Sequence, residues 1–312
     1  MLTLCEAIVE DPEQILRAQV NRAKTEKMAE MKAAGVEYEE RIAKLEEVEH
    51  PKPLREFLYE TFNAFAAAHP WVEAENVRPK SVAREMFERY LSFGDYIRDY
   101  GLERVEGLLL RHLSQVWKVL AQTVPDSAKT EEVAEMEAYF RELIRGVDAS
   151  LIEEWERLKN PEWIATEGGT DKPARPASYD VTRDTASFHR LVRAEIYLIL
   201  QGAMRWAMGA GNPGENEKDK ENENDGRKFE NYFEERGRFR LDPEGRAAKH
   251  THVGATLGEG LAGPGELEVA QVLIDVEGAN DWEAVFVVSL TESRAEDRAV
   301  VRLVAVRSIG SV

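Results

Sequence analysis

The sequence predicts an α+β protein, with an all-helical bundle first and a smaller helix-plus-antiparallel-sheet domain after it. Three observations predict this class. Helical apolar periodicity, with helix start and stop residues, continues from the beginning of the chain to about residue 158. Residues 159–184 are rich in Gly, Pro, Thr and Asp and have no periodicity, which is typical of a linker. Residues 185–312 hold one strongly apolar helical stretch and then three β-branched runs.

The first expected helices have recognisable ends. Asp11 and Pro12 are suited to cap and begin a long charged helix, which Gly35 ends. A more acidic helix follows over residues 37–49 and stops before Pro51. The next stretch places five large apolar residues on one helical face, which we expect to be core. These residues are Leu54, Phe57, Leu58, Phe62 and Phe65.

The remaining helices of residues 1–158 follow the same logic. Pro79 and Ser81 mark the start of one helix, and a second spans most of residues 100–122. Thr130 is placed to cap a third, which reaches roughly to Leu158. Its inward positions are Val133, Met136, Phe140, Ile144, Val147 and Leu151. The periodicity therefore predicts a helical bundle.

The second domain is predicted to begin with a helix and to end in a sheet. The runs ELEVAQVLIDV, WEAVFVVSL and AVVRLVAVRSI are joined by short polar connections, which favour an antiparallel meander and are compatible with a cone-shaped sheet. Residues 209–226 carry six acids and no apolar residue that could be buried, so we expect a disordered acidic loop.

Composition limits the possible functions. The chain has 312 residues, 59 of them acidic and 41 basic, with a formal net charge of -18, so nucleic-acid binding would have to be local. We expect a cytoplasmic protein without a membrane partner, because we find neither a secretory signal nor an apolar run that could span a bilayer. Cys5 is the only cysteine, which excludes an internal disulfide, a thiolate zinc cage and an iron–sulfur cluster.

Two motifs suggest a ligand but lack the right surroundings. Residues 258–263 match the dinucleotide-binding pattern GxGxxG, yet Pro264 follows and no helix is predicted there to receive a pyrophosphate. His250 and His252 could form a metal pair, but no third ligand stands at motif spacing. We therefore predict no cofactor and no metal, and we find no candidate catalytic residue.

Five long polar side chains form a stripe on the helix expected over residues 100–122. At about 100° per residue they fall within roughly 60° of arc, without an acidic residue among them. Leu and Val residues occupy the opposite arc. Arg and Lys can contact phosphates and Gln can contact bases, so this polar stripe is a candidate surface for single-stranded RNA. The alternative is an ordinary solvated helix face. The stripe comprises Arg104, Arg111, Gln115, Lys118 and Gln122.

The same stretch, VEGLLLRHLSQVWKVL, resembles the ratchet helix in the C-terminal helical domain of Ski-type DExH-box RNA helicases. More of the chain is similar to the C-terminal region of a bacterial family of DEAD/DEAH-box helicases that ends in an uncharacterised helicase-associated domain. The similarity is carried by DPEQILRAQVNRAK, GVEYEERIAKLEEV, PKPL, HPWV, RPKSVAREMFERY and EGLLLRHLSQVWKVL.

The resemblance implies a role for individual residues. Arg111 falls on the ratchet-helix arginine, with Gln115 and Lys118 on the same face, and a basic run of the family matches Arg78, Lys80 and Arg84. The two motor domains of such helicases are missing, so the chain is expected to be a separated C-terminal piece that does not hydrolyse ATP.

These inferences together predict an accessory module that guides single-stranded RNA and works with helicase motor domains in cis or in trans. We expect the α+β domain to mediate protein contacts. Two alternatives stay open: an interaction scaffold without nucleic-acid binding, and a small-molecule pocket in the cone-shaped domain.

Overall fold

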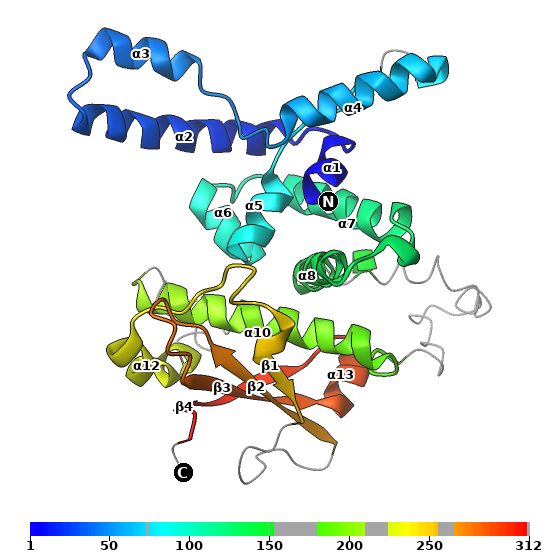
Figure 1. Ribbon diagram of the computed structural model, residues 1–312, viewed down its shortest axis with the longest axis vertical. Helices are drawn as coiled ribbons and strands as arrows, with labels where there is room; N and C mark the ends of the chain where they lie inside the picture. The colour runs from blue at the N-terminus through cyan, green and yellow to red at the C-terminus, as the bar shows by residue number, and fades with distance from the viewer. Residues whose placement is uncertain (73–74, 149, 153–179, 210–223, 255–264, 311–312) are drawn as a thin grey trace. The chain divides into compact units, whose positions relative to one another are not determined.

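The computed structural model describes residues 1–72, 75–148, 150–152, 180–209, 224–254 and 265–310. These residues form a mostly helical N-terminal region followed by a four-stranded antiparallel sheet, which confirms the predicted α+β class. The chain divides into two compact units (Figure 1). The helical unit comprises residues 1–87 and 92–148, and the α+β unit comprises residues 88–91 and 149–312.

The helical unit is built from short and medium helices joined by tight connections. Among the described residues, no helix combines the length and the apolarity that crossing a bilayer would need. The helices of this part of the chain are α1 (Leu2–Ala7), α2 (Glu13–Ala33), α3 (Tyr38–Glu46), α4 (Arg55–Ala68), η1 (Pro70–Val72), α5 (Val82–Arg89), α6 (Phe93–Tyr100), α7 (Glu106–Thr123), η2 (Asp126–Ala128) and α8 (Glu131–Val147).

The core of this unit is formed around α7, which packs against both α1 and α8 (Figure 1). As the periodicity predicts, one side of α7 is buried, with Leu109, Leu113 and Leu120 fully enclosed. From α8, Phe140 and Ile144 are also fully buried. These aliphatic and aromatic side chains provide most of the driving force that holds the helices together.

The N-terminal ends of α8 and α2 show how far the local sequence determines where a helix begins. Thr130 caps α8 as predicted, because its side chain accepts a hydrogen bond from the backbone N–H of Val133. The predicted cap at Asp11 is wrong. The N-cap of α2 is Pro12, without a side-chain hydrogen bond, and the Asp11 carboxylate pairs with Lys80 instead.

The expected core face of α4 is also wrong for most of its residues. Leu58 is 5% exposed and packs with Ala7 and Val77, while Phe62 packs partly buried against them. The other three predicted core residues are exposed. They are Leu54, Phe57 and Phe65.

The α+β unit has strand order β1-β2-β3-β4, with every neighbouring pair antiparallel. All residues of β3 are buried, and α10 lies along one face of the sheet (Figure 1). The Tyr197 hydroxyl on α10 donates a hydrogen bond to the Arg246 carbonyl. The elements are α10 (Thr185–Ala207), α12 (Glu230–Arg236), η4 (Ala248–His250), β1 (Thr251–Val253), β2 (Glu266–Leu273), β3 (Trp282–Ser289), α13 (Leu290–Glu296) and β4 (Val301–Ser308).

The predicted meander is confirmed for β2, β3 and β4, with two additions. The first is β1, which pairs with β2 and contains His252, while His250 lies in η4. The second is α13, which is inserted between β3 and β4 where we expected a short polar connection. Most of the predicted linker 159–184 and of the acidic loop 209–226, and all of the pattern at 258–263, lie outside the described residues.

Candidate nucleic-acid interface

The polar stripe lies mainly on α7, and the structure presents most of it to solvent. Arg111, Lys118 and Gln122 are exposed, and Gln115 is half-buried. Arg104 is exposed but lies in a turn before the helix, whose N-cap is Val105, so it is not part of the helical row. The predicted helix began too early because no capping side chain marks its start.

The electrostatic state of the stripe differs from what α7 alone suggests. Arg111 forms an ion pair with Glu10, whose carboxylate oxygen lies 2.7 Å from an Arg111 guanidinium nitrogen. Both side chains are well exposed, at 64% and 69%, so the pair is screened by solvent and weak. Lys118 has no partner among the described residues. Within α7 the stripe therefore offers one cation without a partner among the described residues, Lys118, and one, Arg111, that a ligand could take over from a carboxylate.

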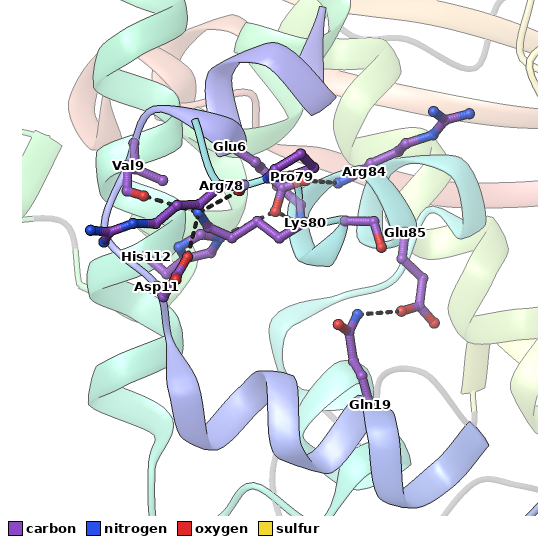
Figure 2. A network of polar contacts seen from close by, with 12 residues as sticks. Glu6, Val9, Asp11, Gln19, Arg78, Pro79, Lys80, Arg84, Glu85 and His112 are labelled. Carbon is purple, nitrogen blue, oxygen red and sulfur yellow. Dashed lines mark hydrogen bonds and ion pairs between the residues drawn. The ribbon is translucent and has the colours of Figure 1, made fainter. Parts of the chain in front are cut away.

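The basic run Arg78, Lys80 and Arg84 is not a single surface. Lys80 is fully buried, and its ammonium donates to the carbonyls of Val9 and Arg78 at 2.9 and 3.1 Å (Figure 2). The same ammonium lies 2.8 Å from the Asp11 carboxylate. Because these partners saturate its three donors, Lys80 holds the fold together and is not available to phosphates.

The two arginines of the run lie on either side of Lys80, and their side chains lead away from each other (Figure 2). Arg78 is exposed, and its backbone N–H donates to the Ala7 carbonyl. Arg84 is half-buried, and its guanidinium donates to the Thr3 hydroxyl at 3.3 Å. Of the three, only Arg78 is an exposed cation whose side chain has no partner among the described residues.

A buried carboxylate fixes α1 and α5 to α7 beneath the stripe. Glu6 is fully buried, and its two oxygens accept hydrogen bonds from the backbone N–H groups of Ala83 and Arg84, at 2.8 and 3.1 Å. The ring nitrogen Nε2 of His112 lies 3.2 Å from the same carboxylate (Figure 2). Glu6 thus caps the first turn of α5 from another helix, which satisfies donors that would otherwise be orphaned.

These buried residues were missed by the sequence interpretation. His112 stands next to the apolar arc of α7, which is a signal that it points inward, but nothing in the sequence pairs it with Glu6. The neighbouring Cys5 is also buried, and burial raises the pKa of its thiol to about 11. The arrangement lies in the buried core and positions α7.

Comparison with known proteins identifies a family. The family described as Domain of unknown function (DUF3516) matches residues 1–306. No curated protein and no solved structure matches the chain.

Proposed function

The chain belongs to the DUF3516 domain family, and we propose that it is an accessory module that guides single-stranded RNA beside a DEAD/DEAH-box helicase motor. The helicase part of this proposal is supported by the resemblance of its helical sequence motifs. The RNA part is supported by the surface of α7.

One observation carries the RNA proposal. The outward face of α7 aligns Arg111, Gln115, Lys118 and Gln122, while the inward face of the same helix is fixed in the core. A rigid row of cationic and amide groups matches what a sequence-tolerant single-strand surface uses, with charge for the backbone and hydrogen bonds for the bases. Arg104 and Arg78 are exposed cations outside the helix that can add phosphate contacts.

The proposed module is not an enzyme by itself. The sequence contains no G-x-x-x-x-G-K-[ST] phosphate-binding loop, so ATP hydrolysis would be supplied by motor domains, in the same polypeptide or in a partner. In this proposal the α+β unit contributes protein contacts.

The test is binding of a fluorescein-labelled, single-stranded RNA oligonucleotide of mixed sequence, measured by anisotropy over a salt series that begins at low ionic strength. Replacing Arg111 and Lys118 together by Ala should weaken binding several-fold. It should also reduce the slope of log K against log salt by roughly one unit for each phosphate that is no longer neutralised. Both side chains are exposed, so the free energy of unfolding should change by no more than about 0.5 kcal/mol.

The matched control is the double variant Arg17→Ala and Lys32→Ala on α2. It removes two exposed cations that match the two on α7. Arg17 is ion-paired, as Arg111 is, and Lys32 has no partner among the described residues, as is the case for Lys118. We expect it to keep the parental affinity apart from the general effect of net charge. If the α7 variant is folded and binds as well as this control, the stripe is only a solvated face and the scaffold alternative replaces the RNA proposal.

A further inference from the structure

Helix α4 exposes an apolar row that the fold leaves without a partner among the described residues. Within the helix, Phe57, Thr61, Ala64 and Ala68 have the alternating spacing of a helix seam, and all but Thr61 are apolar. The N-cap residue Leu54 precedes them and extends the row. Phe57 is 62% exposed and Leu54 58% exposed. The next large side chain beside the row, Phe65, is 44% exposed. We call these six residues the α4 row.

Helix α4 is not free to rotate and bury the row. The opposite side of α4 is anchored, because Leu58 is buried with Ala7 and Val77 and because Tyr59 and Phe62 pack against that cluster. Rotating α4 to bury Phe57 would bring Leu58 into water, and no described residue is placed to cover the row.

The α4 row is bordered by two acidic residues with no ion pair in the described part of the chain. Glu56 and Glu60 are exposed and stand one helical turn apart, on the flank next to Phe57. The nearby cations do not neutralise them: Lys52 and Arg55 both lie near the same Glu49 carboxylate, at 2.8 and 3.6 Å.

An open hollow of about 870 Å³ lies on this flank. Leu54, Phe57, Tyr59 and Asn63 line it together with charged side chains of both signs. Glu56 and Glu60 have no ion pair among the described residues, whereas Lys52 and Arg55 lie near Glu49. A long basic side chain suits such a hollow, because its methylene stem can cover the aromatic rings while its charged end reaches the carboxylates.

The distal half of α4 favours a protein over a nucleic acid. From Thr61 to Val72 the chain has no Asp, Glu, Lys or Arg, so there is no cation there to contact a phosphate. Ala64, Ala67 and Ala68 are exposed small residues over which another helix can come close. The row ends in an exposed aromatic group, in which Phe65 stacks on His69 at 4.1 Å and meets Trp71 edge-on at 5.9 Å.

We infer that α4 is a docking site for a basic amphipathic helix of another protein. The apolar seam of that helix would cover the α4 row, and Lys or Arg side chains on its edge would face Glu56 and Glu60. The spacing of the α4 row favours a helix as the partner, and charge complementarity with Glu56 and Glu60 favours a basic one. The inference does not depend on RNA binding, which involves α7.

The test uses the full chain and two designed, labelled helical peptides with the same leucine seam. One carries Lys at the positions flanking the seam and the other carries Glu. The Lys peptide should bind about tenfold or more tightly than the Glu peptide at low salt, because charge pairs at the edge choose the partner. Phe57→Ala should weaken the Lys peptide by about tenfold or more, as truncation of an interface anchor does. The matched control is Tyr38→Ala on α3, whose side chain is similarly exposed at 64% and which should leave binding unchanged.

A charge-exchange experiment distinguishes specific docking from non-specific binding. The double variant Glu56→Lys and Glu60→Lys should reverse the preference, so that the Glu peptide binds better than the Lys peptide. The control pair Glu39→Lys and Glu46→Lys changes the net charge equally on α3 and should not reverse it.

Four outcomes would overturn the inference. Equal binding of both peptides, or binding insensitive to Phe57→Ala, would show that α4 does not choose a basic helix. Self-association of the chain that disappears in the Phe57→Ala variant would identify a second copy as the occupant. Loss of RNA oligonucleotide affinity in that variant, with α7 intact, would make α4 a nucleic-acid surface.

Discussion

Helices α4 and α7 have similar apolar periodicity, but the apolar face of α7 is covered by neighbouring helices, whereas much of the apolar face of α4 is exposed. Leu109, Leu113 and Leu120 of α7 are enclosed because α1 and α8 pack against that helix. The apolar residues of α4 are divided: Leu58 is buried against Ala7 and Val77, whereas Phe57 and Phe65 remain in solvent. Periodicity thus identifies which residues share a face, but the number of neighbouring elements decides whether that face is core or a surface that can bind a partner.

The largest effect expected from this comparison is on the α7 side. Leu113 is fully buried, so Leu113→Ala removes apolar packing and leaves a cavity between the helices. We expect the free energy of unfolding to fall by about 2–5 kcal/mol. Urea unfolding followed by far-UV circular dichroism would measure it. A decrease below about 1 kcal/mol would mean that α7 is much less tightly enclosed than its burial indicates.

An intermediate effect is expected at the carboxylate that joins α1 and α5 to α7. Glu6→Ala leaves the backbone N–H groups of Ala83 and Arg84 without their acceptor, which should cost about 1–3 kcal/mol. Cys5 reports the change directly, because its buried thiol should react slowly with a disulfide reagent in the parent and faster in the variant. The exposed neighbour Glu10 provides the control: Glu10→Ala should leave the labelling rate of Cys5 unchanged.

The smallest effect should be found on α4. Phe57→Ala removes a large side chain that is mostly in water, so we expect the free energy of unfolding to change by no more than about 0.5 kcal/mol. The urea midpoint, compared with that of Leu113→Ala, would sharpen the contrast between the two helices. Destabilisation above about 1.5 kcal/mol would instead place Phe57 in a packed site and would remove the basis for a docking surface.

The sequence predicted features that depend on neighbouring residues. Thr130 caps α8 because its partner, the Val133 amide, is only three residues away. The strands of the meander likewise follow from β-branched runs, although α13 replaces the short connection that was expected between β3 and β4. Such local signals were sufficient for the fold class.

What could not be predicted depends on residues far apart in the chain. Lys80 was assigned to a basic surface, but Asp11 and the Val9 carbonyl hold its ammonium in the interior. The pairing of Glu6 with His112 joins positions more than a hundred residues apart. For the α7 stripe, the helical periodicity was visible in the sequence, whereas the carboxylate opposite Arg111 comes from Glu10 and had no local signal.

Because Glu10 pairs with Arg111 but not with Lys118, the two cations of α7 differ in their ionic surroundings before a ligand binds. In the proposed RNA complex, Lys118 would contact a phosphate without first breaking an ion pair, and the contact would release a cation that had been condensed on the RNA. At Arg111 a phosphate would have to displace Glu10, and the freed carboxylate would attract a cation from solution in turn. The Lys118 contact would therefore raise the concentration of free cations, whereas the Arg111 contact would largely exchange one counterion for another. Removing Lys118 alone should thus flatten the salt dependence of RNA binding more than removing Arg111 alone, even where the two variants lose the same affinity.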